Sequence, residues 1–290
     1  MNPTETYVII TPARDEEKYI GGTIESVIAQ TVLPVEWIIV DDGSSDSTAK
    51  IAEDYATKFP WMKVFRREDR GKRKSGEGVM EAFYYGLAKI TYLEWDYLVK
   101  LDADLTFEKD YFELCFQHFK KNPRLGIGGG KVFNNINGRL RFEPHPQFHV
   151  RGATKIYRRK CWEEIGGLIK MTGWDTIDEV KANMGGWETY TFDEPVLIHH
   201  RITGGAEGTF QNYIKNGKGS FIIGYHPLFL LAKAINLIFG SANFKAGLGL
   251  LYGFIQGYLK KIPRIEEKEV IYYLRRQQLN RLFFRNTIWK

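Results

Sequence analysis

Short apolar runs alternate with longer amphipathic segments over the first hundred residues of the chain. Apolar runs bounded by turn residues are typical of buried strands, and apolar residues recurring every three or four positions are typical of helices. The predicted strands are 7–10, 36–40, 62–65 and 97–101, and the predicted helices cover about 16–30, a segment after 45 or 46, and about 79–90. This alternation predicts an α/β fold with a mostly parallel sheet flanked by helices.

The pattern is less regular after the fourth strand. Residues 107–121 predict a helix, 126–133 and 152–157 strands, 161–165 a short helix and 194–201 a late strand. Ile177, Val180 and Met184 predict a helix that faces the core, whereas the polar, proline-containing residues 134–149 predict a loop. Two apolar segments follow, at 228–239 and 244–262, and each is too short to span a bilayer.

Composition and charge add limits to this picture. The chain has 290 residues and 43% hydrophobic residues, enough for a full core. Cys115 and Cys161 lie far apart without metal spacing, which predicts no disulfide framework or zinc site and suits a reducing compartment. The first predicted strand begins almost at once, so we expect no signal peptide.

The net charge of +6 is confined to the end of the chain. Residues 260–290 contain nine Lys or Arg and three Glu, whereas the first 259 residues are neutral overall. Such a basic tail suits anionic lipid, nucleic acid or simply a solvated helix face.

Two carboxylates follow the fourth strand, Asp102 and Asp104. Strand side chains alternate, so both can point from the carboxyl end of the sheet into the crevice where open α/β sheets bind ligands. Hard cations such as Mg²⁺ take oxygen ligands and often bridge to phosphates. The pair therefore predicts a metal on a nucleotide diphosphate; the alternative is a plain strand-to-turn signal.

Three more strand ends, 11–16, 41–46 and the basic 70–74, open on the same edge. Carboxylates and a peptide loop can hold a base and ribose, and basic side chains can meet phosphates. Neither a dinucleotide fingerprint nor a P-loop motif occurs in the sequence.

A second acidic group, Asp175, Asp178 and Glu179, precedes or begins the helix around Ile177. The helix dipole favours carboxylates there, so plain helix-start chemistry is the alternative to a functional role. The late strand leads to His199 and His200, a pair that is more often structural than ligating.

These motifs together resemble a family-2 glycosyltransferase of the GT-A type, a Rossmann-like fold. The resemblance covers roughly the first 200 residues, through 9–31, 40–48, 71–87, 101–104, 152–167 and 178–186. It implies an inverting transferase that uses a nucleotide-diphospho-sugar and Mg²⁺ or Mn²⁺. It also divides the chain into a catalytic domain at 1–205, with nucleotide-binding (1–105) and acceptor (106–205) halves, and a helical, amphipathic, basic extension at 206–290.

The resemblance assigns roles position by position. The nucleotide-sugar would contact ten residues: Pro12, Ala13, Arg14, Glu16, Asp41, Asp42, Lys72, Lys74, Asp102 and Ala103. The metal would be held by Asp104 and Asp102, with His200 or its neighbour His199 as a further ligand. The family's Glu-Asp pair appears here in swapped order as Asp178-Glu179, and of the two we favour Glu179 as the catalytic base.

The chemistry of an inverting transfer agrees with these residue types. The acceptor hydroxyl attacks from the face opposite the leaving diphosphate, a carboxylate takes its proton, and a metal neutralises the developing charge. The base must therefore lie across the sugar from Asp104, on a separate element.

The apolar segments and basic tail suit a protein lying in a membrane interface; packing on the catalytic domain or a dimer contact is the alternative. The expected acceptor is then a saccharide or polyprenyl-linked saccharide of envelope polysaccharide synthesis, and the expected location cytoplasmic or peripheral on the inner face of the cell membrane. One rival function is that of a sugar-phosphate nucleotidyltransferase, but this sequence lacks the Gly-rich phosphate loop expected of that class. Another is that of a basic nucleic-acid-binding protein, but we do not expect nucleic acid as a partner.

Overall fold

The computed structural model describes residues 5–69, 71, 76–136, 138–142, 145–201, 209–240 and 243–288. The described strands are β1 (Tyr7–Ala13), β2 (Glu36–Asp41), β3 (Met62–Arg66), β4 (Tyr97–Leu101), β5 (Leu105–Phe107), β6 (Leu125–Ile136), β7 (Arg139–Phe142), β8 (Thr154–Arg158) and β9 (Glu188–His199). The helices are α1 (Ile20–Ile28), α2 (Thr48–Ala56), α3 (Glu77–Leu87), α4 (Tyr111–Lys121), α5 (Arg159–Ile165), α6 (Trp174–Met184), α7 (Thr209–Ile222), α8 (Pro227–Ile235), the π-helical turn η2 (Asn236–Gly240), α9 (Phe244–Leu259) and α10 (Lys268–Leu282).

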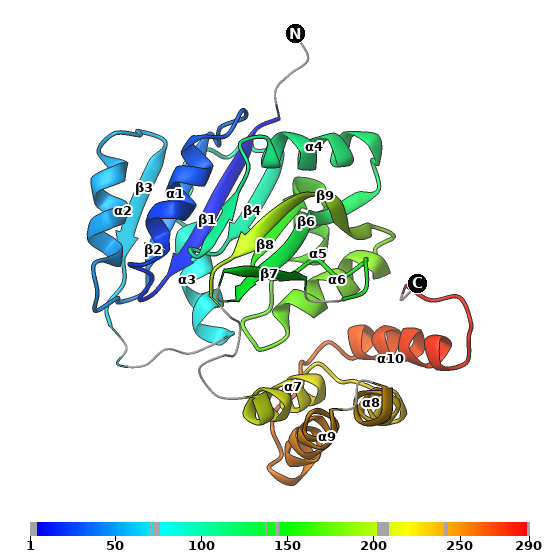
Figure 1. Cartoon of the computed structure of the whole chain (residues 1–290). Helices are drawn as coiled ribbons and strands as arrows, with labels where there is room; N and C mark the ends of the chain where they lie inside the picture. The colour runs from blue at the N-terminus through cyan, green and yellow to red at the C-terminus, as the bar shows by residue number, and fades with distance from the viewer. Residues whose placement is uncertain are drawn as a thin grey trace.

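The described strands form one sheet in the order β3-β2-β1-β4-β8-β6-β9-β5, with β7 paired to β6. The four strands from β3 to β4 are parallel, and β8 joins them antiparallel. Helices cover both faces (Figure 1). The predicted α/β class and GT-A architecture are confirmed.

The central strands are buried on both faces, which explains their continuous apolar runs. Tyr7 and Ile9 of β1 pack with α1, whereas Val8 and Ile10 pack with α3. Gly86 lets α3 approach closely, since a Cβ there would lie 2.8 Å from a methyl group of Ile10. Because these layers fix the direction of the parallel strands, their carboxyl ends emerge together at one edge.

The structure differs from the sequence prediction in three elements and in the orientation of one residue. The expected loop at 134–149 contains the end of β6 and the strand β7, joined by a turn in which Gly138 has a φ of 80°. The helix expected from 107 begins at Tyr111, because the residues before it form β5 against β9. β9 begins at Glu188, six residues before the predicted start. Met184 is 38% exposed and does not face the core.

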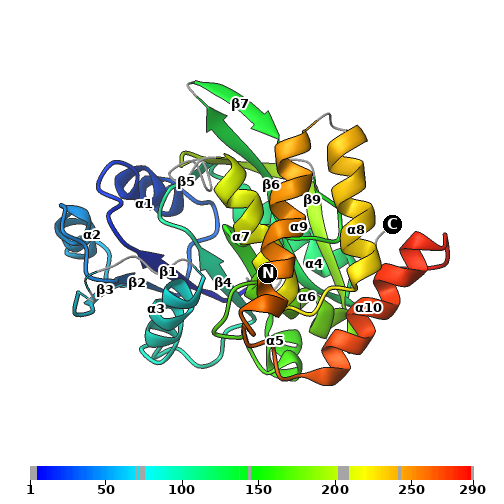
Figure 2. The same cartoon turned by 90° about the horizontal axis from the view of Figure 1, so that it is seen from below.

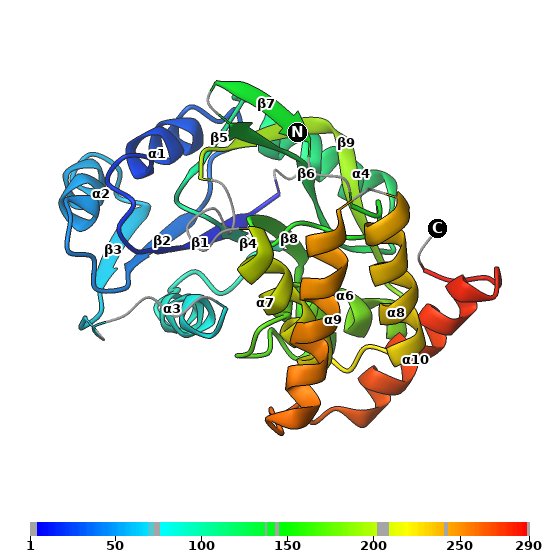
Figure 3. The same cartoon turned by 60° about the horizontal axis from the view of Figure 1, so that its bottom comes forward.

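The chain after β9 is helical wherever it is described. Helices α7, α9 and α8 lie side by side in that order on one side of the sheet (Figures 2 and 3). Val270 and Leu274 of α10 share an apolar cluster with Ile177 and Val180 of α6. In the described ranges, no helix is long and apolar enough to cross a membrane. The boundary predicted at 205 lies outside the described residues, and the domain division stays a prediction.

Candidate active site

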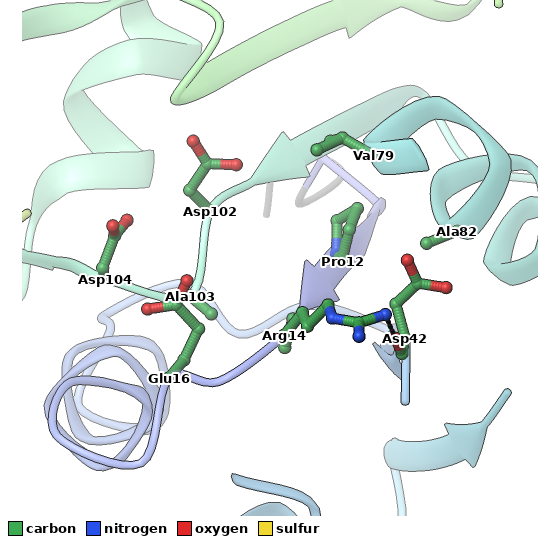
Figure 4. A pocket seen from close by; sticks show the side chains of 10 residues that line it. Pro12, Arg14, Glu16, Asp42, Val79, Ala82, Asp102, Ala103 and Asp104 are labelled. Atoms are coloured by element: carbon green, nitrogen blue, oxygen red, sulfur yellow. Dashed lines mark hydrogen bonds between the residues drawn. The ribbon is translucent and has the colours of Figure 1, made fainter. Parts of the chain in front are cut away.

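A pocket opens at the carboxyl ends of β1, β2 and β4 (Figure 4). It is lined by Pro12, Ala13, Arg14, Glu16, Asp42, Val79, Ala82, Asp102, Ala103 and Asp104. Asp104, Ala103 and Glu16 lie toward one end of it, and Asp42 lies at the other. Most of the residues predicted to bind a nucleotide-sugar therefore line one pocket.

Three predicted residues are not in this lining. Asp41 is buried at the end of β2, where its carboxylate accepts hydrogen bonds from the backbone N–H of Ser44 at 3.3 and 3.4 Å. Desolvation raises the pKa of Asp41. Lys72 and Lys74 lie outside the described residues. Conversely, Val79 and Ala82 of α3 line the pocket without having been predicted, because their pattern is that of ordinary core-facing helix positions.

The loop after β1 is held by polar contacts from neighbouring strand ends. Arg14 donates to the carbonyl of Asp42 at 2.8 Å and to the carboxylate of Asp69 at 2.7 Å. The N–H of Glu16 donates to the hydroxyl of Thr48 at 2.7 Å. These contacts preorganise one wall of the pocket, so a ligand need not order the loop on binding.

Asp104 lies beside His199 of β9. The His199 Nε2 is 3.2 Å from Asp104 Oδ2, and Leu105 of β5 pairs with His199 across the sheet. Although burial acts to raise it, the hydrogen bond and charge of His199 hold the pKa of Asp104 below its ordinary value. Strand geometry thus brings together two groups ninety-five residues apart in sequence.

The prediction named His200 or its neighbour His199, and the structure places the His199 imidazole beside the Asp104 carboxylate. His200 Nε2 lies 2.7 Å from the hydroxyl of Thr106, and its ring stacks on Tyr19 with centroids 6.0 Å apart. β9 ends at His199, and the imidazole of His200 is directed to Thr106 and Tyr19.

This pair has the donor chemistry for a divalent cation. Asp104 Oδ1 and His199 Nδ1 are buried without a hydrogen-bond partner. A buried carboxylate oxygen left unpaired is costly unless a ligand supplies the partner. Within the described part of the chain, no three carboxylate, imidazole or thiol groups converge on a single point. A cation here would therefore complete its shell with water and substrate phosphate, as Mg²⁺ usually does.

Asp102 is paired to a buried lysine. The ammonium of Lys100 donates to Asp102 Oδ1 and, at 2.6 Å, to the carbonyl of Gly152. It also lies 5.2 Å from the ring centroid of Trp174. The Asp102 side chain remains 31% exposed, so it can still accept a hydrogen bond from a ligand.

The two carboxylates on α6 that were predicted to include the catalytic base are buried inside the protein. Lys155 donates to both oxygens of Asp178, at 2.9 and 2.8 Å, and to Glu179 Oε1 at 2.8 Å. Glu179 also accepts from the N–H of Val150 at 2.7 Å and contacts His149 Nδ1 at 2.9 Å. Desolvation raises the pKa of Asp178 to about 6. Asp178 is 1% and Glu179 0% exposed, so neither carboxylate reaches the cleft.

Asp175, one turn earlier on α6, is half-buried. Its carboxylate rests on the backbone of Gly152, where an added Cβ would lie 3.2 Å from Asp175 Oδ2. The carbonyl of Gly152 accepts from Lys100, which also donates to Asp102. Asp175 does not line the pocket, but Gly152 and Lys100 link it indirectly to Asp102. The sequence signal for it was its place ahead of the buried pair, at the helix start.

Comparisons with known proteins agree with this geometry. A poly-β-1,6-N-acetyl-D-glucosamine synthase of Staphylococcus epidermidis is 33% identical over 196 residues, which cover 65% of this chain and 43% of that protein. The corresponding synthase of Staphylococcus aureus (strain COL) is 31% identical over the same length, with the same coverage. The chain thus spans less than half the length of these curated relatives.

Two solved structures share the fold. A mannosyltransferase from Pyrobaculum calidifontis in complex with GDP-Man and Mn²⁺ has a TM-score of 0.56 and 16% identity, covering 97% of this chain and 88% of that one. S. aureus TarS has a TM-score of 0.55 and 16% identity, covering 93% and 78%. The family model for glycosyl transferase family 2 matches residues 8–173. The chain therefore belongs to glycosyl transferase family 2.

Proposed function

We propose that the protein is an inverting transferase that moves a sugar from a nucleotide-diphospho-sugar to a hydroxyl of a saccharide or lipid-linked saccharide in envelope polysaccharide or glycan synthesis. The observation that carries the proposal is the pocket that the unpartnered Asp104 Oδ1, beside His199, shares with the loop of Pro12 to Glu16. This arrangement offers a cation site beside a wall of the pocket that polar contacts preorganise.

The donor would occupy the pocket along its length. The loop of Pro12 to Glu16 and the carboxylate of Asp42 would contact the nucleoside, and Asp102 a ribose or sugar hydroxyl. Lys72 and Lys74 stay predicted phosphate contacts. One solved relative holds GDP-Man and TarS has been solved with UDP-GlcNAc, so the proposal covers both UDP and GDP donors.

Asp104 and His199 would hold Mg²⁺ or Mn²⁺, with Asp102 nearby. When bound, such a cation supplies charge neutralisation for the leaving diphosphate. The Mn²⁺ in the related mannosyltransferase supports this part of the proposal.

We place the proton acceptor at Asp175 rather than at Asp178 or Glu179. A general base must come within hydrogen-bond reach of the proton it removes, directly or through one water. Asp178 and Glu179 have no exposed surface and already accept hydrogen bonds from Lys155 and its neighbours. Lys155 also donates to the main-chain oxygen of Asp175 at 2.6 Å, so the buried pair would act by positioning the start of α6.

The transfer then follows from these positions. The acceptor oxygen forms its bond to the anomeric carbon on the face away from the diphosphate while the bond to the diphosphate oxygen breaks. Asp175 takes the hydroxyl proton, and the configuration at the anomeric carbon inverts. The acceptor side of this scheme also includes peripheral contact of the C-terminal helices with an anionic membrane on its cytoplasmic side.

A thermal-shift screen of UDP- and GDP-sugars with Mn²⁺ tests the donor site. A ligand at about a hundred times its dissociation constant stabilises the fold by about 2.7 kcal/mol, which raises Tm by about 5 °C. We expect one nucleotide-sugar to give such a shift, and removal of the metal with EDTA to abolish most of it. A screen in which no nucleotide-sugar changes Tm, with or without Mn²⁺, would contradict the proposal.

A further inference from the structure

Helices α8 and α9 expose large apolar side chains on the surface turned away from α7. We call this the outer face and define it by Leu228, Leu231 and Ile235 of α8 and Leu248, Ile255 and Leu259 of α9. These six residues are between 42% and 77% exposed. They recur at spacings of three, four or seven residues along each helix, so each set forms one continuous stripe.

The strip of α9 that meets α7 carries glycines. A Cβ at Gly253 would lie 2.0 Å from the carbonyl oxygen of Ile214, and one at Gly257 would lie 2.2 Å from the ring of Phe221. Gly249 likewise faces Tyr213, at 2.9 Å. The backbones of α7 and α9 therefore meet through a Gly-xxx-Gly-xxx-Gly surface that presents no side chains.

The outer face departs from the pattern of a surface helix in water. A helix at an aqueous surface buries its large apolar residues and turns polar residues outward. Here α9 buries Leu250 and Phe254, meets α7 through glycines and still carries large apolar residues on its outer face. Close packing through small residues is the way helices associate where lipid already surrounds their apolar side chains.

The charge of the same segment has one sign. Residues 208–265 contain seven Lys or Arg and no Asp or Glu. Lys245 and Lys260 lie at the two ends of α9 and are exposed. Lysine stems can lie along apolar surface while their ammonium groups reach anionic headgroups. Two copies of the chain joined through this face would instead bring like charges together.

We propose that the outer face of α8 and α9 docks into the headgroup region of an anionic lipid bilayer, with both helices lying in the interface. The apolar stripes would enter the boundary of the acyl chains, and the flanking lysines would meet the phosphates.

This docking names the acceptor class, a step that rests on the proposed transfer function. Arg201 donates to Glu16 of the pocket, and α7 begins eight residues later. Eight residues reach at most about 29 Å, so α7, on which α9 packs, begins within that distance of Arg201. The geometry therefore fits a saccharide acceptor carried on a lipid and presented from the bilayer.

Vesicle flotation of the full chain tests the docking. We expect the wild-type protein to float with vesicles of 70% phosphatidylcholine and 30% phosphatidylglycerol at physiological salt, and far less with phosphatidylcholine alone. The variant L248E/I255E should lose at least tenfold of the bound fraction. The matched control is Leu93→Glu, in the loop before β4, because Leu93 is equally apolar and 68% exposed; it should float like the wild type. Thermal melts establish that each variant is folded.

Three outcomes would overturn the docking. They are wild-type protein that floats with neither vesicle, a folded L248E/I255E variant that floats as well as the wild type, and lipid-free self-association that this variant abolishes. The last result would assign the face to a second copy. The nucleotide-sugar thermal shift is measured on the same preparations. Failed flotation with an intact shift rejects only the docking, and flotation without any shift rejects only the transfer function.

Discussion

Two carboxylate pairs in this protein have similar chemistry and different surroundings. Asp102 and Asp104 follow β4, and Asp178 and Glu179 lie on α6, and in each pair a carboxylate accepts from a buried lysine. The lysines, Lys100 and Lys155, are register partners across β4 and β8, and both lie within 6 Å of the Trp174 ring centroid. The pairs differ in whether a carboxylate oxygen remains without a hydrogen-bond partner. Asp104 keeps one oxygen without a partner, whereas every oxygen of the α6 pair accepts a hydrogen bond or contacts His149.

This difference separates residues that can meet a ligand from residues that hold the site together. A carboxylate with unused hydrogen-bonding capacity at a pocket can bind a cation or a hydroxyl. A fully satisfied and fully buried carboxylate has nothing to offer a substrate, but its loss leaves a buried ammonium uncompensated. Substitutions in the two carboxylate pairs should therefore change different measurable quantities.

The largest effect is expected at Asp175, which lies between the two carboxylate pairs in the network of contacts. Asp175→Asn keeps the shape but removes the proton acceptor, so kcat should fall by about 10²–10⁴-fold. Donor affinity should be unchanged, as measured by the nucleotide-sugar thermal shift. Steady-state release of nucleoside diphosphate in the presence of acceptor measures kcat.

Glu179→Gln is the comparison for this experiment, because Glu179 supports α6 without reaching the cleft and its substitution should lower kcat less than Asp175→Asn does. If Glu179 were the base, as the sequence prediction favoured, this variant would lose turnover as strongly while Asp175→Asn retained it. That pattern would return the proton acceptor to the buried pair.

The next effect is expected at Asp104. Asp104→Asn should raise the Mn²⁺ concentration required for half-maximal turnover by at least about a hundredfold, because even residues that only support a metal ligand contribute about 10–100-fold. Manganese titrations of activity measure it, and His200→Ala serves as the control that should leave the titration unchanged. A normal titration for Asp104→Asn would place the cation elsewhere.

The first half of the fold was predictable because its physics is local. Strands such as β1 and β2 are buried on both faces and read as continuous apolar runs, and each is followed by an amphipathic helix. The strands β5 and β7 were missed because three or four residues carry too little periodicity. The turn containing Gly138 follows an Asn in the sequence, an Asn-Gly hairpin signal that was available and unused.

The site was predictable to the extent that strand ends determine it. Pro12, Asp42 and Asp104 each follow or end a parallel strand, so topology alone brings them together. The carboxylates on α6 are satisfied only because one face of the helix meets Lys155. Lys155 lies twenty-three positions from Asp178 in the sequence. Asp178 and Glu179 were chosen because they resemble the family's acidic pair, and sequence alone cannot tell a satisfied carboxylate from an available one.

Substitution of the two buried lysines should lower the free energy of unfolding by different amounts. Lys155→Met leaves two fully buried carboxylates without their ammonium, so the free energy of unfolding should fall by about 3–5 kcal/mol. Lys100→Met leaves Asp102 with access to water, so the loss should be nearer 1 kcal/mol. Urea denaturation measures both. Equal losses would mean that the two pairs are not different in the way that their exposure indicates.

The last prediction concerns the pH dependence of stability. Burial raises the pKa of Asp178 to about 6, above the value of about 3.9 for an unfolded chain. A carboxyl with a raised folded-state pKa stabilises the fold below the unfolded pKa, and that contribution disappears as pH rises through about 6. The free energy of unfolding of the wild type, minus that of Asp178→Asn, should therefore decrease by no more than about 3 kcal/mol between pH 4 and 7 and then level off. Urea denaturation of both proteins across this range measures the difference. A difference that stays flat or increases with pH would mean that Asp178 is ionised throughout, with Lys155 fully compensating its burial, and the contrast between the two carboxylate pairs would then rest on exposure alone.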